Sequence, residues 1–369
     1  MKISHRNDEQ SSFASYNWKL SYEENVQLAP LQFEIPETKV PVGHEWDFLG
    51  RRVACPVGIA AGPLLNGNWL LSYARLGYDV LTYKTVRSVA RASYKMPNLV
   101  PVTGKLSQQG DLHAQQQLTD SWAISFGMPS LPPDQWRRDL ERTRKLLSAE
   151  KVLVVSVVAS PMDDWSIDEI ADDYAKCARW AIESGADCVE VNLSCPNVCS
   201  ADGQLYLHPH ASEKVVKRVR TAIGNAPLIA KIGYYWPQDI EVGFELLKAV
   251  AGTVDALAMT NCITSRIMDP LDSTGLFDGQ TRGIGGRSIF GQSVEQVAMF
   301  NKWKLPVDSE RRMQLIGVGG IAGTEDAKAY WAAGANFVQI ATAAILDPSC
   351  GPRIGSELST ASSDNRPVT

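Results

Sequence analysis

The sequence lacks the features of a membrane or exported protein. Its longest apolar run, residues 152–159 with Ser156 as the one interruption, is far shorter than the roughly 20 residues of a membrane-spanning helix. The first fourteen residues are polar and charged and contain no apolar core of a secretory signal. We therefore expect a protein that is neither inserted into a membrane nor exported.

The sequence also lacks an excess of basic residues, and its cysteines are not paired in motifs. The chain carries 36 Lys and Arg against 41 Asp and Glu, a formal charge of −5, so it has no positive field to attract nucleic acid. Its seven cysteines are an odd number without CxxC spacing, which indicates a reducing cytoplasm and argues against iron–sulfur clusters and structural zinc. We expect a cytoplasmic protein with a small-molecule partner and no metal.

What the sequence does contain is a repeated pattern of strand and helix. Short β-branched runs alternate with amphipathic segments, the clearest of which follows Ser166, where Glu169 completes a capping box and Gly185 ends the pattern. Eight strands alternating with helices predict a closed TIM (β/α)8 barrel rather than an open doubly wound α/β sheet. The strands are expected over 57–60, 80–83, 153–158, 188–193, 228–232, 256–260, 315–318 and 337–341. Helices are expected from 68 and over 133–150, 213–223, 239–250, 294–303 and 325–333.

The barrel is expected to span 50–346, with an N-terminal extension, 1–49, packed on it. Lacking clear periodicity, the first 45 residues are expected to wrap the bottom of the barrel or fray. Some seventy residues separate the second strand from the third, so 84–133 is predicted to be an insertion of the kind that forms lids and substrate pockets. The tail, 347–369, is rich in Ser, Thr and Pro and is predicted to be a short helix around PRIGSEL or a disordered segment.

Polar residues at the carboxyl ends of barrel strands are the candidate functional residues, because active sites of this fold lie there. Lys84 ends the second strand and Lys231 ends the fifth. Burying a lysine is costly unless an anion meets it, which here is either a ligand or the carboxylate of an ion pair. Neither strand end carries an Asp or Glu, so we favour a ligand.

Glycines follow the seventh strand, and a small polar segment follows the eighth. The backbone N–H groups of Gly319 and Gly320, together with Ala341 and Thr342, suit a phosphate, which barrels usually bind at these two loops. The alternative is a pair of tight turns. A further glycine-rich stretch, TRGIGGRS with Gly283, Gly285 and Gly286, is predicted to be a loop.

Cys195 follows the fourth strand, in a segment that also holds Asn192, Ser194 and Asn197. A thiol whose pKa of about 8.5 is lowered by its neighbours can serve as a proton acceptor or as a nucleophile. Cys199 lies four residues further on, but the loop lacks the second pair of ligands that zinc requires.

The string VNLSCPNV at 191–198 resembles the signature of the dihydroorotate dehydrogenases, specifically the cysteine-containing class 1 enzymes. Dihydropyrimidine dehydrogenase has a similar flavin domain. Further motifs occur in the order of the family: CPVGIAAG, LTYKT, ISFGMPS, IAKIGYY, MTNCITS, GIGG, LIGVGGI and VQIATA.

The resemblance implies FMN bound at the mouth of the barrel. Lys84, Thr85, Asn192 and Lys231 would contact the polar edge of the flavin, where a cation stabilises the negative charge of the reduced ring. The other implied cofactor residues line the flavin, the ribityl chain and the phosphate: Ala60, Ala61, Gly62, Gly285, Gly286, Gly319, Gly320, Ala341 and Thr342.

The implied reaction is the oxidation of dihydroorotate to orotate in pyrimidine biosynthesis. Cys195 would take a proton from the carbon beside the substrate carbonyl while hydride passes from the adjacent carbon to the flavin, with Lys84 and Ser194 in the same catalytic site. The residues implied to hold the substrate are Lys84, Phe126, Gly127, Met128, Asn192, Asn197, Asn261 and Cys262.

Two positions depart from the family pattern and leave alternatives open. Ile124 stands where the family typically has a substrate-binding Asn, and Cys262 stands where Ser or Thr is expected, so each removes a hydrogen bond. One alternative is an FMN oxidoreductase acting on another dihydropyrimidine or cyclic amide. Another is a non-redox lyase or isomerase that binds a phosphorylated substrate at the glycine loops. The resemblance further implies a homodimer and leaves open an electron-transfer partner subunit and the electron acceptor.

Overall fold

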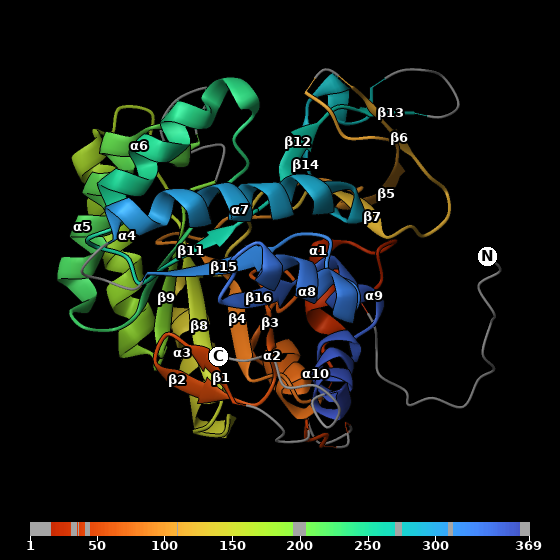
Figure 1. The fold of residues 1–369 in the computed structure, drawn as a ribbon, viewed down its shortest axis with the longest axis horizontal. Coiled ribbons are helices and arrows are strands. Elements are labelled where there is room, and N and C mark those ends of the chain that lie inside the picture. The colour runs from red at the N-terminus through yellow and green to blue at the C-terminus, as the bar shows by residue number, and fades with distance from the viewer. Residues whose placement is uncertain are drawn as a thin grey trace.

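The computed structural model describes residues 16–30, 35, 37–40, 45–108, 110–194, 204–269, 275–308 and 313–361. Eight parallel strands close into a barrel in the order of the chain, and the last strand pairs with the first (Figure 1). They are β3 Val57–Ile59, β4 Val80–Val86, β8 Val152–Val157, β9 Cys188–Asn192, β10 Leu228–Lys231, β11 Ala256–Met259, β15 Gln314–Val318 and β16 Phe337–Ile340. The predicted TIM barrel is confirmed, and all eight strands lie where the sequence places them.

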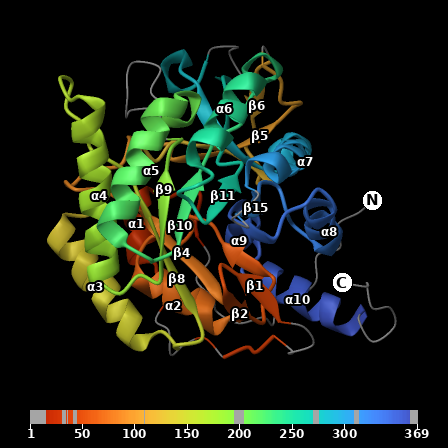
Figure 2. The same cartoon turned by 60° about the vertical axis from the view of Figure 1, so that its left-hand side comes forward.

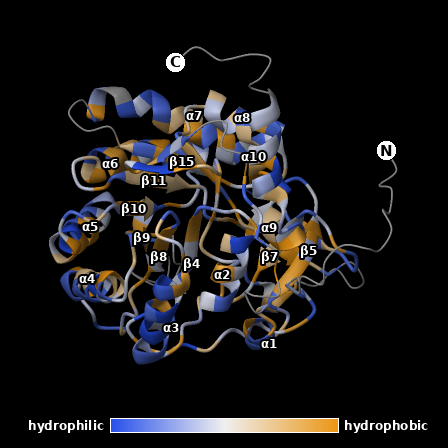
Figure 3. Cartoon of the chain, turned by 90° about the horizontal axis from the view of Figure 1, so that it is seen from below, coloured by the Kyte–Doolittle hydropathy of each residue, from blue (hydrophilic) through white to orange (hydrophobic). Residues whose placement is uncertain are grey.

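Helices surround these strands as a ring, which the view from below in Figure 3 shows. The ring consists of α2 Gly67–Arg75, α3 Pro133–Leu146, α4 Ile167–Glu183, α5 Pro209–Ile223, α6 Ile240–Val250, α7 Phe290–Val307, α8 Thr324–Ala332 and α10 Cys350–Ala361. A short helix, α9 Thr342–Leu346, follows β16, and 3-10 turns lie at Leu205–Leu207, Pro237–Asp239, Phe277–Gly279 and Arg287–Ile289.

Local sequence signals fix the start and the end of α4. The Ser166 Oγ accepts a hydrogen bond from the Glu169 backbone N at 3.3 Å, and the Glu169 carboxylate accepts one from the Ser166 backbone N at 2.7 Å. This is the predicted capping box. Gly185 follows with a φ of +101°, a left-handed conformation that ends the helix at little cost for glycine.

The last helix is longer than the sequence suggests. Gly, Ser and Thr are weak helix formers, so the tail lacks a strong local signal, yet α10 extends over twelve residues. Its contacts with the barrel explain the difference, because Ile354 is fully buried and the Gly351 backbone N donates to the Tyr78 hydroxyl at 2.9 Å. Tertiary packing therefore outweighs propensity here.

A hairpin closes the bottom of the barrel. It consists of β1 Trp46–Phe48 and β2 Arg51–Val53, which lie at the lower end of the strands in Figures 1 and 2. Phe48 is buried edge-to-face against Phe337 with ring centroids 4.9 Å apart. The amino ends of the barrel strands are thereby covered by aromatic packing.

The described N-terminal segment, 16–30, lies at the opposite end of the barrel. It contains α1 Tyr22–Gln27, and the Tyr22 ring lies over the Lys84 ammonium near the carboxyl end of β4. The expectation that the first 45 residues wrap the bottom is therefore wrong for α1, whereas Thr38, whose backbone N donates to the Arg75 carbonyl at 2.7 Å, lies near the amino end of β4 as expected. Composition alone could not decide between the two ends, because the deciding contacts are made by single aromatic rings.

The insertion between β4 and α3 contributes β5 Leu99–Thr103, β6 Leu112–Ala114 and β7 Ser121–Ile124. The chain after β11 adds β12 Ile263–Ser265, β13 Ile267–Met268 and β14 Arg282–Gly286. These strands form one six-stranded sheet, in the order β12-β14-β7-β5-β6-β13, over the carboxyl end of the barrel (Figure 1). The sheet places two distant segments of the chain beside the candidate site.

Candidate functional site

Three polar side chains project into the carboxyl end of the barrel interior. Side chains alternate along a strand, and Cys188 belongs to the apolar cluster inside the barrel, so Asn192, four residues further along β9, faces the same way. The same alternation from Ile229 brings Lys231 inside, and Lys84 enters from β4. Lys84 is 6% exposed, Asn192 4% and Lys231 2%, so all three are withdrawn from water.

The two lysines differ in how their charges are met. The Lys84 Nζ donates to the Pro129 carbonyl at 3.0 Å, with the Tyr22 ring centroid 5.2 Å away. In the described part of the chain, the Lys231 Nζ forms no hydrogen bond and no ion pair, and Glu190 on the adjacent strand does not pair with it. A buried, unpartnered ammonium at a barrel mouth fits an anionic ligand.

Asn192 connects the predicted substrate residues. Its Oδ1 accepts hydrogen bonds from the Asn261 Nδ2 at 3.3 Å and from the Ser194 backbone N at 3.0 Å, and its Nδ2 lies 3.8 Å from the Met128 Sδ. Ser194 also donates from its Oγ to the Lys231 carbonyl at 3.4 Å. The structure therefore brings together side chains from β9, from the insertion and from the loop after β11.

Cys195 and Asn197 lie outside the described residues, as does Cys199. The chain reaches Ser194 at the edge of the site, and Tyr206, on the other side of the undescribed stretch, donates its backbone N to the Leu193 carbonyl. The described residues on both sides of this stretch therefore lie close to Asn192 and Lys231.

Glycines from two elements meet at the other side of the barrel mouth. A Cβ at Gly320 would lie 2.9 Å from the Gly286 carbonyl oxygen, and a Cβ at Gly286 would lie 2.1 Å from the Asp120 carbonyl oxygen. Gly319, Gly320 and Gly286 all have left-handed φ values, +129°, +72° and +90°. Thr342 lies beside these glycines, since its Oγ1 would be 3.3 Å from a Cβ at Gly285. Only glycine permits these close approaches, because other atoms of the protein occupy the space that a Cβ would need.

The GIGG stretch is a strand rather than the predicted loop. Gly283 and Gly285 belong to β14 and pair with Ile124 and Trp122 of β7. Glycine is depleted in strands, so the local sequence favours a loop, and the long-range pairing with β7 overrides that preference.

The remaining predicted cofactor residues lie at the ends of the first, second and eighth barrel strands. The Ala60 backbone N donates to the Ile340 carbonyl at 3.0 Å, just before Ala341. The Thr85 Oγ1 donates to the Ser156 Oγ at 3.0 Å, and Gly62 has a φ of +145°. Ala61 lies between Ala60 and Gly62, so these positions share the carboxyl end with Lys84.

The two departures from the resemblance lie together. Ile124 pairs with Gly283, and a Cβ at Gly283 would lie 2.9 Å from the Cys262 Cβ. Burial raises the pKa of the Cys262 thiol to about 11, against a smaller opposing effect of Lys231. At the two departing positions the chain therefore has an apolar side chain, Ile124, and a protonated, neutral thiol, Cys262.

Comparison with known proteins decides the family. The sequence model described as dihydroorotate dehydrogenase matches residues 45–361, which is most of the chain. The chain belongs to the dihydroorotate dehydrogenase family. It is therefore an enzyme, a flavin-dependent oxidoreductase, and the predicted function class is confirmed.

Individual relatives are similar over most or half of the chain. A protein named dihydroorotate dehydrogenase from Dictyostelium discoideum is 29% identical over 90% of this chain and 94% of its own length. The catalytic subunit of a dihydroorotate dehydrogenase B (NAD(+)) from Geobacter sulfurreducens is 30% identical over 58% of this chain and 68% of its own. A dihydroorotate dehydrogenase A (fumarate) from Limosilactobacillus reuteri is 28% identical over 51% and 58%.

The N-terminal segment brings aromatic residues to the candidate site that were not predicted from the sequence. Tyr22 and Tyr16 pack against the predicted substrate residue Phe126, with centroids 5.5 Å and 6.3 Å away. Ser21 and Glu24 form a capping box at the start of α1, and this spacing is the signal that could have placed the helix.

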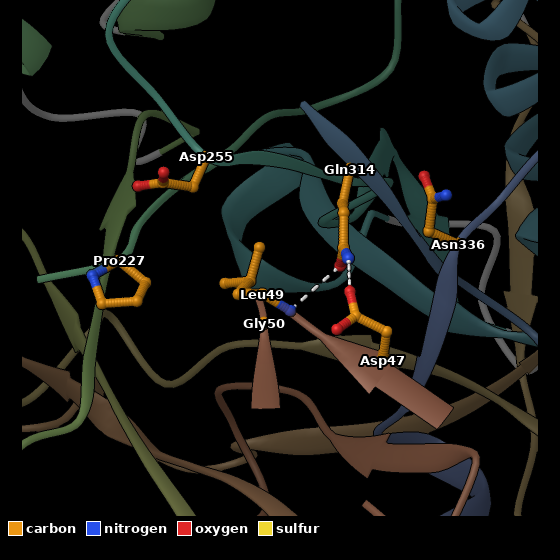
Figure 4. Close-up of a pocket in the computed structure, with 7 residues that line it drawn as sticks. All are labelled: Asp47, Leu49, Gly50, Pro227, Asp255, Gln314 and Asn336. Carbon is orange, nitrogen blue, oxygen red and sulfur yellow. Dashed lines mark hydrogen bonds between the residues drawn. The ribbon is translucent and has the colours of Figure 1, made fainter. Parts of the chain in front are cut away.

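A separate cavity lies at the amino end of the barrel (Figure 4). It is lined by Asp47, Leu49, Gly50, Pro227, Asp255, Gln314 and Asn336. The Gln314 side chain accepts from the Leu49 backbone N at 3.3 Å and donates to Asp47 at 2.5 Å, and Asp255 pairs with Arg220. These groups satisfy one another and stabilise the closed bottom, at the end of the barrel remote from catalysis in this fold.

Neither a membrane-spanning helix nor a cluster of metal ligands occurs among the described residues. No helix among them is both long and apolar enough to cross a bilayer. Within the same ranges, no three His, Cys, Asp or Glu side chains gather as metal ligands would.

Proposed function

We propose that this enzyme uses FMN to oxidise dihydroorotate to orotate at the carboxyl end of the barrel. The observation that carries the proposal is the Lys231 ammonium, which is 2% exposed and has no partner among the described residues. The position of Gly319 and Gly320 after β15, and of Thr342 after β16, supports the phosphate end of the same cofactor, because barrels usually bind phosphates at these two loops. Lys231 ends β10, whereas the glycines follow β15, so the cation and the glycines would contact different parts of one anionic molecule.

The residues proposed to hold FMN are those that the family resemblance implies. Lys84, Thr85, Asn192 and Lys231 would contact the polar edge of the flavin. The backbone of Ala60, Ala61 and Gly62 would lie along the flavin and ribityl chain. The phosphate would be held by the loops of Gly285, Gly286, Gly319, Gly320, Ala341 and Thr342.

Bound FMN supplies a two-electron acceptor for the hydride of the substrate. In the proposed reaction the Cys195 thiolate takes a proton from the carbon beside the dihydroorotate carbonyl, while the adjacent carbon loses hydride and the double bond of orotate forms. Asn192, Asn197 and Asn261 would hold the amide edge of the pyrimidine. Lys84, Ser194, Phe126, Gly127, Met128 and Cys262 would complete the pocket.

The proposal includes the cell compartment and the partners. Cys55, Cys177, Cys188, Cys262 and Cys350 are free thiols, which supports a cytoplasmic enzyme. We propose a homodimer, and relatives named for NAD(+) and for fumarate leave the electron acceptor and an electron-transfer subunit to be measured.

Colour and anaerobic bleaching test the proposed reaction. Purified enzyme should absorb near roughly 370 and 450 nm, as oxidised flavins do, and anaerobic dihydroorotate should bleach the longer band. Dihydrouracil, which lacks the carboxylate, serves as the matched substrate control. A colourless protein that binds FMN in no assay would contradict the cofactor, and bleaching by dihydrouracil alone would contradict the substrate.

A further inference from the structure

The N-terminal segment 16–30 makes contacts in the candidate site although it precedes the region that the family model matches, 45–361. Tyr22 is 8% exposed, and its ring centroid lies 5.2 Å from the Lys84 Nζ. This distance is within the range of a cation–π interaction, which strengthens when the pair is withdrawn from water.

Aromatic contacts also join the N-terminal segment to the insertion. Phe126 packs edge-on against Tyr22 at 5.5 Å, and Tyr16 packs against Phe126 at 6.3 Å. The Lys84 ammonium also donates to the carbonyl of Pro129, three residues after Phe126. The Lys84 head group is thus held between a carbonyl of the insertion and a ring of the N-terminal segment.

The segment is anchored by specific hydrogen bonds. The Tyr22 backbone N donates to the Asn98 Oδ1 at 2.8 Å, and the Trp69 Nε1 donates to the Asn25 carbonyl at 2.9 Å. The Ser93 hydroxyl donates to the Glu23 carboxylate at 2.9 Å. Two residues of the insertion and one of α2 therefore fix the position of the segment that carries the Tyr22 ring.

The Tyr22 hydroxyl is not an ionic partner for the lysine. Burial raises the pKa of this phenol far above its ordinary value, with smaller contributions from Tyr16 and Glu23. The ring is therefore neutral at physiological pH and offers the lysine its π face.

We propose that Tyr22 is a positioning residue that holds the Lys84 ammonium in the orientation in which it meets the substrate. The inference rests on the proposed function, because it assigns Lys84 to the dihydroorotate site. It adds a residue of the N-terminal segment to that site and makes the segment a fixed wall of the substrate pocket.

The test compares Tyr22→Leu, which removes the π face, with Tyr22→Phe, which retains it. Orotate binding is measured as a perturbation of the flavin spectrum, which requires no turnover. Tyr22→Leu should weaken orotate about tenfold, and Tyr22→Phe should bind within about twofold of wild type. Phe244→Leu is the matched control, because it removes a surface cation–π contact of 5.0 Å to Lys248 and should leave orotate binding unchanged.

A second readout needs no substrate. In enzyme labelled with ¹³C at the lysine ε-carbons, the ring current of Tyr22 should shift the Lys84 resonance, assigned with Lys84→Arg, and Tyr22→Leu should abolish that shift. If Tyr22→Leu does not fold, Tyr22→Met is used in both measurements.

Orotate binding of wild-type strength by Tyr22→Leu or Tyr22→Met would overturn the role of Tyr22, as would a Lys84 resonance that neither variant moves. Wild-type enzyme whose flavin is not bleached by dihydroorotate would instead contradict the proposed function. The two failures are therefore distinguishable.

Discussion

Lys231 and Asn192 are register partners on the neighbouring parallel strands β10 and β9, and both side chains enter the barrel mouth at the same level. The amide of Asn192 is bonded within the site, whereas the ammonium of Lys231 has no partner among the described residues. This pairing of a satisfied amide with an unsatisfied cation is the structural basis of the proposed flavin site.

Replacing Lys231 should weaken FMN binding without lowering the stability of the apoprotein. Lys231→Met keeps the length of the side chain and removes its charge, so FMN affinity should fall roughly 10- to 100-fold with the loss of a charge-assisted hydrogen bond. The apoprotein should be as stable as wild type or more stable, because an unpartnered buried charge is replaced by an apolar group. FMN titration and urea unfolding of the apoprotein measure the two effects.

Lys248→Met, an exposed position on α6, is the control and should change neither quantity. Wild-type FMN affinity in Lys231→Met, together with an apoprotein destabilised by several kcal/mol, would show that Lys231 has a structural partner instead.

Thiol reactivity should distinguish Cys195 from the buried cysteines. Burial raises the pKa of Cys55 to about 12 and of Cys262 and Cys350 to about 11, so these thiols are protonated near pH 7.5. Only a thiolate reacts readily, so iodoacetamide should label Cys195 first, and orotate should protect it. Peptide mass spectrometry reads the order of labelling. Labelling of Cys262 before Cys195 would contradict the assignment of the base.

The pH dependence of flavin reduction should follow the same thiol. Deprotonation creates the base, so the rate should rise with pH through one group that titrates between about 6 and 9. Cys195→Ser should retain FMN and slow reduction by about 10²- to 10³-fold. A flat profile over this range in stopped-flow measurements would remove Cys195 from the mechanism.

Ile124 and Cys262, which each remove a hydrogen bond expected in the family, should limit the affinity for dihydroorotate. Ile124→Asn supplies an amide where the family typically has one, and the KM for dihydroorotate should fall by roughly fivefold to tenfold with one added hydrogen bond. Cys262→Ser, which replaces the neutral thiol with a stronger donor, should act in the same direction. Steady-state kinetics with both variants tests this, and a raised KM in both would indicate a pocket shaped for a less polar substrate.

A side chain at Gly286, one of the glycines that meet at the barrel mouth, should destabilise the protein. Gly286→Ala places a Cβ 2.1 Å from the Asp120 carbonyl oxygen at a φ of +90°, so we expect a loss of about 2–3 kcal/mol of unfolding free energy and much weaker FMN binding. Gly291→Ala, at an exposed position of α7 with no atom nearby, should instead add about 0.5–1 kcal/mol. Denaturant unfolding of both variants checks the opposite signs. Equal stabilities would contradict the close approach.

The barrel could be predicted from the sequence because its signals are local. The alternation that places Cys188 and Asn192 on one face and the capping box of Ser166 each depend on residues a few positions apart. The lysines and glycines of the site follow from the same strands, because the fold brings the carboxyl ends of the strands together.

The parts that could not be predicted depend on contacts between distant residues. GIGG becomes β14 only because β7 pairs with it, and α10 forms because Ile354 is buried against the barrel. The position of Tyr22 over Lys84 joins residues 62 apart in sequence, and no local pattern in the N-terminal segment specifies that contact.

The most direct test of the account is a crystal structure of the enzyme with FMN and orotate. We predict that the FMN phosphate lies against the backbone of Gly286, Gly319 and Gly320. The pyrimidine edge of the flavin should lie within hydrogen-bonding distance of the Lys231 Nζ, and the Cys195 sulfur should lie across the orotate from the flavin. An FMN molecule bound away from Lys231, or a Cys195 sulfur turned away from orotate, would contradict it.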